Sequence, residues 1–175
     1  MVGLNLNKHQ VLFALSNLHR PWVITEGIGA GKAAIAESRS LYGAMSHVDD
    51  AGDAFRHTYA AGRLKLAYMS RHGASEELAD RLVTRLGNAH ERDGWHNPLG
   101  QVSSAMDHHN NAAGMLVTGA GRTPDGAWMS NEQVRSGVLD AMRGGTLVRI
   151  QAGAIVPTGP RDLPKAIDAL PALVR

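Results

Sequence analysis

The polar stretch at residues 107–111, which reads D-H-H-N-N, limits the possible folds of this chain more than any other segment. Residues three, four and seven apart share one face of a helix, so Asp107, Asn110, Asn111 and Gly114 form one stripe if the stretch is helical. A carboxylate and two carboxamides are costly to bury without hydrogen-bonding partners. The stripe therefore either faces water or forms a site between helices.

Two further groups of acidic and histidine residues lie upstream. Asp53 and His57 are spaced i and i+4, and His90 is followed directly by Glu91. Leucines at positions 78, 82 and 86 lie on the helical line that ends at His90, so we expect its imidazole to point inward. Taken alone, each group has a structural explanation, such as an i,i+4 contact of about 0.2–0.5 kcal/mol. Three separately placed groups of this kind favour one shared polar pocket.

Helical spacing and capping residues predict a mainly α fold, a compact domain of about six helices with a short C-terminal β-hairpin. The predicted helix N-caps are Asn7, Asp49 or Asp50, Ser75, Ser103 or Ser104, and Ser130. A glycine-rich turn at residues 27–31 is expected before a helix that runs to about Ala44. The hairpin pairs residues 146–150 with 154–156. A length of 175 residues fits a single domain over 1–175, with its core at 22–157.

Several function classes are excluded by the sequence. Residues 26–33 read E-G-I-G-A-G-K-A, whereas a phosphate-binding loop needs glycine at the first position and Ser or Thr after the lysine. Nucleic acid is not an expected partner, because the net charge is only +2 and no basic run is interleaved with aromatic residues. The absence of cysteine excludes disulfides, zinc–thiolate sites and a thiol nucleophile.

No transmembrane helix is expected, because no stretch of about 18 apolar residues occurs. The first ten residues contain no apolar segment behind a basic start, so no signal peptide is evident. If the protein acts outside the cell that makes it, we expect secretion by a route that does not depend on a signal peptide.

Three segments give the chain a family resemblance: 53–59 (D-A-F-R-H-T-Y), 89–91 (A-H-E), and 106–111 (M-D-H-H-N-N) followed by Gly114. They resemble a bacterial domain of unknown function with the pattern D-A-F-R-H-x-Y-W, A-H-E and M-D-x-H-N-N-x-x-G. The chain differs in having Ala60 where tryptophan is usual and His108 where leucine is usual. Such domains often close wall-associated or polymorphic-toxin proteins. The resemblance therefore implies an antibacterial effector that acts in a target bacterium, but it implies no particular reaction.

The polar residues suit hydrolysis, and the predicted catalytic residues are His57, His90, Glu91, Asp107, Asn110 and Asn111. Imidazole and carboxylate ligands suit zinc and other divalent metals, and the predicted ligands are His57, His90, Asp107 and His109. Glu91 or Asp53 would then orient a ligand or activate water. In a metal-free alternative, His57 is the base, oriented by a carboxylate, and the two asparagines donate to a developing oxyanion. Both mechanisms remain open.

The function predicted from the sequence is a toxin that hydrolyses an envelope substrate, either phospholipid or cell-wall material. A cognate immunity protein is the expected partner. The alternative is a pore-forming or membrane-perturbing toxin without catalytic chemistry, in which residues 23–36 and 112–120 insert into the membrane. A third possibility is a binding protein that blocks its target without chemistry.

Overall fold

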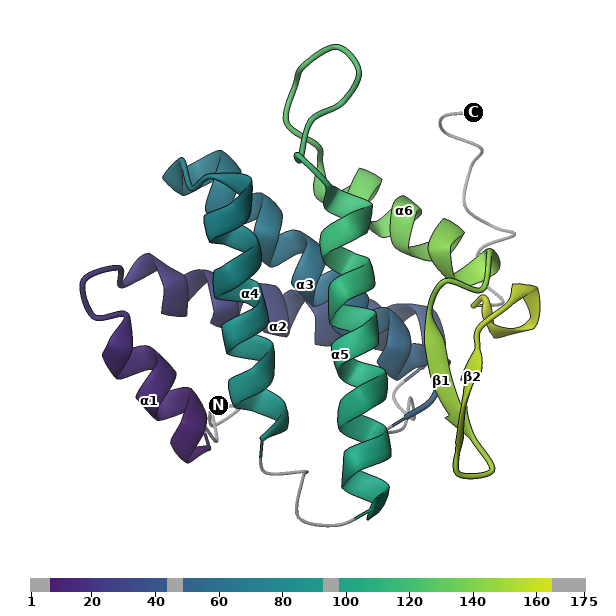
Figure 1. Cartoon of the computed structure of the whole chain (residues 1–175). Coiled ribbons are helices and arrows are strands. Elements are labelled where there is room, and N and C mark those ends of the chain that lie inside the picture. The colour runs from purple at the N-terminus through teal and green to yellow at the C-terminus, as the bar shows by residue number, and fades with distance from the viewer. Residues whose placement is uncertain (1–6, 44–48, 93–97, 165–175) are drawn as a thin grey trace.

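The computed structural model describes residues 7–43, 49–92 and 98–164. Helices α1 to α6 span Lys8–Ser16, Trp22–Tyr42, Ala51–His72, Glu76–Glu91, Pro98–Thr118 and Asn131–Arg143, followed by strands β1 (Val148–Gln151) and β2 (Ala154–Pro157) and a 3-10 turn, η2 (Pro160–Asp162). Figure 1 shows the hairpin lying alongside α5. The predicted mainly α fold, with six helices and a C-terminal hairpin, is confirmed. The predicted domain limits include both ends of the chain, which lie outside the described residues.

The predicted caps set most of the helix boundaries. Asn7 and Ser130 each form a capping box with the glutamine three residues later, and the side chains of Asp50 and Ser75 accept backbone N–H groups at the starts of α3 and α4. Helix α3 ends at Gly73, whose φ of 64° is the left-handed conformation that glycine adopts at little cost.

Helix α3 lies at the centre of the molecule and packs against α2, α4, α5 and α6. Its large side chains are buried on more than one side, with Phe55 and Tyr59 in one apolar cluster and Tyr68 and Met69 in another. Glycine allows α5 to pack closely against α3. At Gly114 of α5, an added Cβ would lie 2.9 Å from the carbonyl carbon of Thr58 and closer still to its oxygen.

Two predicted boundaries were wrong. Residues 27–31 are not a turn but part of the continuous helix α2. Gly27 faces α4, where an added Cβ would lie 2.9 Å from Leu86 Cδ2, so helix packing accounts for this glycine. Helix α5 begins at Pro98 and not after Ser103 or Ser104. Proline is favoured in the first turn of a helix, because a backbone N–H at that position has no hydrogen-bond partner within the helix and its absence costs nothing.

The hairpin is antiparallel, with Val148 opposite Pro157 and Ile150 opposite Ile155. Its two-residue turn, Ala152 and Gly153, has positive φ at both positions, as a turn matched to the strand twist requires.

Across the described ranges, none of the helices combines the length and the apolar character needed to cross a bilayer.

Candidate functional site

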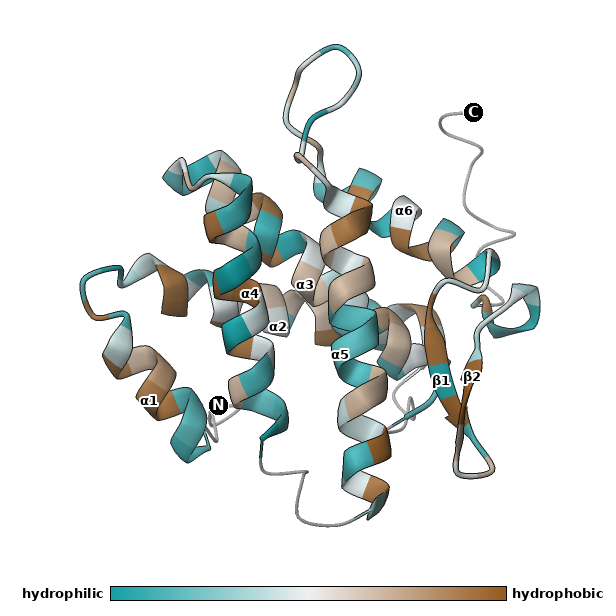
Figure 2. Ribbon diagram, in the orientation of Figure 1, coloured by the Kyte–Doolittle hydropathy of each residue, from teal (hydrophilic) through white to brown (hydrophobic). Residues whose placement is uncertain are grey.

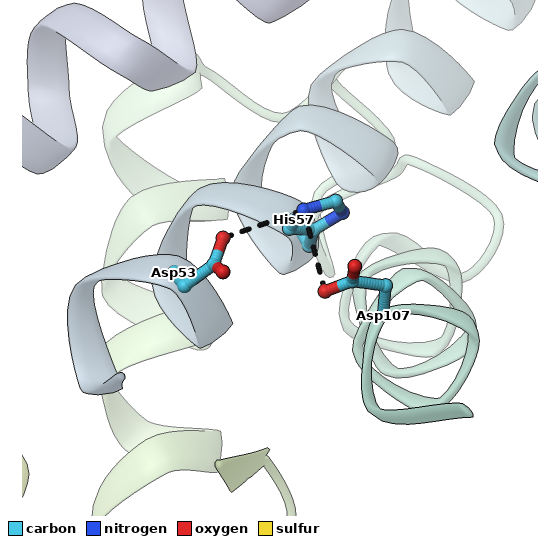
Figure 3. Close-up of side chains that lie close together, drawn as sticks. All are labelled: Asp53, His57 and Asp107. Carbon is cyan, nitrogen blue, oxygen red and sulfur yellow. Dashed lines mark ion pairs between the residues drawn. The ribbon is translucent and has the colours of Figure 1, made fainter. Parts of the chain in front are cut away.

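The side chains of Asp53, His57 and Asp107 meet between α3 and α5, and we call them the Asp–His–Asp cluster. His57 Nε2 lies 3.4 Å from Asp53 Oδ1 and 3.3 Å from Asp107 Oδ1 (Figure 3). One ligand atom from each residue lies within 4.8 Å of the other two. The side chains of Asp53 and Asp107 are only 1% and 7% exposed, so the cluster gathers two carboxyl groups out of water.

The fold fixes each member of the cluster. Asp53 and His57 are one turn apart on α3, and Asp107 faces them because Gly114, two turns further along α5, lets the helices approach. Asp53 Oδ2 accepts the backbone N–H of Asp49 at 2.6 Å. Asp49 has a φ of 72°, and its carbonyl accepts the N–H of Ile150 in the hairpin at 2.9 Å. The loop before α3 and the hairpin therefore hold the Asp53 carboxylate in place.

Three carboxylate oxygens in this region are buried and accept no hydrogen bond within the described ranges: Asp53 Oδ1, Asp107 Oδ1 and Glu91 Oε1. Asp53 Oδ1 does form an ion pair with Arg56. Buried carboxylate oxygens that accept no hydrogen bond are costly in a protein interior unless a cation is present. The local chemistry is therefore suited to binding a cation.

The carboxyl pKa values differ strongly within the cluster. Burial raises the pKa of Asp107 to about 8; the charge of His57 lowers this pKa, and the neighbouring carboxylates of Glu91 and Asp53 raise it. Burial also raises the pKa of Glu91, which shares a hydrogen bond with Asp107. Burial alone would raise the pKa of Asp53, but the neighbouring His57 imidazole, the charge of Arg56 and the backbone N–H of Asp49 bring it below its ordinary value.

The raised pKa of Asp107 predicts a pH dependence for the metal-free protein. Native Asp107 keeps its proton between its ordinary pKa of 3.8 and about 8, whereas the unfolded chain loses it near 3.8. The unfolded state then binds fewer protons, so the free energy of unfolding falls as pH rises through this range. We expect a fall of about 1–3 kcal/mol in urea titrations with a chelator present. The variant Asp107→Asn should lose most of this slope, and an unchanged slope would contradict the assignment.

The last turn of α4 presents Glu91, not His90, to the interior. Glu91 is buried next to Asp107, whereas the His90 side chain is 58% exposed, so the predicted inward orientation of His90 was wrong. Gln10 of α1 contacts His90 Nδ1 at 3.0 Å and holds the imidazole at the surface. The His57 and His90 ring centroids are nevertheless 6.1 Å apart, so His90 borders the site.

His109 and Asn110, predicted as a metal ligand and a catalytic residue, contact β1 and the residues before it, and the structure does not bring them to the cluster. Asn110 is fully buried, and its amide both donates to Val148 O at 2.8 Å and accepts from Val148 N at 3.0 Å. His109 Nε2 lies 2.8 Å from Thr146 O. Asn111 packs against Gly87 of α4 and borders a cavity. The stripe predicted from residues 107–111 therefore serves both the site and the attachment of the hairpin.

An apolar cavity of about 430 Å³ lies between α1, α2, α3 and α4 and reaches the cluster. His57, Arg56, His90 and Glu91 form a polar part of its lining, and aliphatic side chains from three helices form much of the rest: Ile24, Ile28, Leu64, Val83 and Leu86. Sequence reasoning missed Arg56 as a site residue, although it stands between Asp53 and His57 in the same motif. It also missed the apolar cavity wall formed by α2.

The geometry of the cluster suits a divalent cation. Nitrogen–oxygen separations of 3.3 and 3.4 Å match the edge of about 3.3–3.6 Å of a tetrahedron with metal–ligand bonds of about 2.0–2.2 Å. Two carboxylates and one imidazole make a three-ligand set that leaves a position for water, the usual arrangement in catalytic sites. The predicted ligands His57 and Asp107 are both members of this set, and Asp53 takes the place predicted for His90 and His109.

Comparison with known proteins gives a family but no activity. No curated protein and no solved structure matches the chain. A family model described as "Domain of unknown function (DUF6973)" matches residues 14–145. This span includes the three residues of the Asp–His–Asp cluster, Asp53, His57 and Asp107. It also includes their three polar neighbours, Arg56, His90 and Glu91. Because the match covers well over half of the sequence, the chain belongs to this family of domains of unknown function, DUF6973.

Proposed function

We propose that the protein is a metal-dependent hydrolase that cleaves an acyl ester of an envelope phospholipid and serves as an antibacterial effector. The observation that supports this most strongly is the Asp–His–Asp cluster beside an apolar cavity whose polar part contains Glu91 and Arg56. In this role the protein acts in a target bacterium, and its producer carries a cognate immunity protein.

Asp53, His57 and Asp107 would hold a divalent ion such as zinc, which would supply Lewis-acid polarisation of an ester carbonyl and a lowered pKa for a bound water. Glu91 accepts the proton of the attacking water and passes it to the departing glycerol oxygen as the acyl carbon–oxygen bond breaks. Its burial and its hydrogen bond to Asp107 keep this carboxyl group in position. Arg56 lies in the cavity wall and supplies positive charge for a phosphate.

The cavity favours an acyl chain over a cell-wall glycan. Most of its wall is aliphatic, and Phe13 is the only phenylalanine, tyrosine or tryptophan among the described residues that line it. Sugar recognition would require more polar groups along the wall, whereas an acyl chain needs only apolar surface. A volume of about 430 Å³ is within the range of natural ligand pockets.

The decisive test incubates the purified protein with vesicles of phosphatidylglycerol and phosphatidylethanolamine and measures fatty acid release by mass spectrometry. We expect release that a chelator abolishes and added Zn²⁺ or Mn²⁺ restores. Release that persists after complete metal removal would instead support His57 as a metal-free base. Dye leakage without any lipid product would support the pore-forming alternative. Failure to release fatty acid with any of these metals would refute the proposal.

A further inference from the structure

Helix α1 presents apolar side chains to solvent along one face. Val11, Leu12, Leu15 and Leu18, the last in the turn after the helix, are 42%, 61%, 55% and 71% exposed. Their spacing of one, three and four residues places them on one side, while Phe13 on the opposite side is buried. Figure 2 shows the resulting brown stretch along α1. We call these four side chains the α1 apolar face.

The charge around this face is positive. The first 25 residues contain no Asp or Glu, and Lys8 is exposed at the start of the helix. Beside α1 lies a hollow lined by His9, Arg85, Arg92 and His108, with no acidic residue among the described residues that line it. The guanidinium of Arg85 lies over the Phe13 ring, 5.7 Å from its centroid, and donates to Ser16 Oγ at 3.3 Å. An apolar face flanked by cationic groups is complementary to an anionic lipid surface.

The position of α1 connects this face to the site. Gln10, Phe13 and Ala14 line the apolar cavity from the inner side of the helix, while Leu12 and Phe13 border the basic hollow. A surface met by the α1 apolar face would therefore lie next to both the cavity and the cationic groups. The acyl chains would then be close to the apolar cavity, and the anionic headgroups would be close to the basic hollow.

We propose that α1 and its following turn dock the protein on an anionic phospholipid surface. The four apolar side chains enter the boundary between headgroups and acyl chains, and Lys8, Arg85 and Arg92 face the headgroup phosphates. The helix lies in the plane of the interface and does not span the bilayer. This inference names the surface on which the enzyme works, and it rests on the proposed function only for the statement that a lipid chain enters the cavity.

The experiment is co-sedimentation of the full chain with vesicles, performed in a chelator so that no hydrolysis occurs. Vesicles of phosphatidylglycerol mixed with phosphatidylcholine are compared with vesicles of phosphatidylcholine alone. We expect binding to be at least about 10-fold stronger with phosphatidylglycerol, and the double variant Leu12→Glu/Leu15→Glu to lose most of it. The matched control is Leu116→Glu on α5, since Leu116 is 79% exposed and lies on another helix. The control should bind as the wild type does.

Binding that survives in the double variant, or that is equally strong on both kinds of vesicle, would overturn the docking proposal. A dimer in light scattering that the same double substitution dissociates, without vesicle binding by the wild type, would show that a second copy covers this face and would also overturn it. Hydrolysis of a short-chain, monomeric ester is measured separately. The double variant should keep this activity, because none of its changes touches the cluster. If wild-type vesicle binding is as expected and no ester is cleaved, docking stands and the proposed hydrolysis fails.

Discussion

Replacing Gly114 with alanine is expected to destabilise the protein severely. The added methyl group would overlap the backbone carbonyl of Thr58 on α3, which cannot move away as a flexible side chain could. Separating α3 from α5 would open the central packing and pull Asp107 from His57. We expect the free energy of unfolding to fall by at least about 3 kcal/mol, measured by urea titration with circular dichroism.

The matched control for this prediction is Gly29→Ala in α2. No atom lies within 4 Å of the position that its Cβ would take, apart from the glycine's own neighbours in the chain and helix. Alanine is favoured over glycine within a helix by about 0.8–1.0 kcal/mol, so this variant should be as stable as the wild type or more stable. Equal stability of the Gly114 variant and the wild type would show that α3 and α5 are further apart than described.

Removing a ligand of the cluster should abolish catalysis without unfolding the protein. We expect His57→Ala and Asp107→Asn each to lower the rate of ester hydrolysis by at least about 10³-fold. Mutation of a residue that only hydrogen-bonds to a metal ligand already lowers activity by about 10–100-fold, and loss of the ligand itself should cost more. Metal content, measured by mass spectrometry after dialysis, should fall in parallel. Asp107→Asn should also raise the stability of the chelated protein at pH 8 by about 1–2 kcal/mol, because the variant removes one of several crowded carboxyl groups.

The control for the ligand variants is His109→Ala. His109 neighbours the cluster in sequence but contacts Thr146 O, so its loss should leave metal content and hydrolysis nearly unchanged. Full activity in His57→Ala would contradict the proposed site. Activity lost in all three variants, with metal still bound, would indicate a general structural effect of the changes instead of loss of a metal centre.

Much of the fold was predictable because its signals are local. Capping residues and helical spacing identify helices from neighbours within a few residues, and the Asp53–His57 pair follows from the i,i+4 rule. The inward turn of Glu91 was not predictable, because Gln10 of α1, 80 residues away, holds His90 at the surface. The role of Asn110 was equally hidden, since its partner Val148 lies 38 residues further on, in β1.

The glycine-rich segment of α2 shows a different limit. Several glycines within five residues favour a turn when judged by local propensity. Packing overrides this preference, since Gly27 lies against Leu86 and Ala30 and Ala34 are buried in the interior of the fold. Contacts with other helices therefore stabilise a helix that its own sequence only weakly favours.

The attachment of the hairpin has a practical consequence for biochemistry. The family match ends at residue 145, yet Asn110 inside the match is paired with Val148 beyond it. An excised fragment that stops at the family boundary would leave a buried amide without its acceptor and its donor, directly after the turn of α5 that carries Asp107. Fragments for assay should therefore extend at least through Asp162, whose carboxylate pairs with Arg149 of β1.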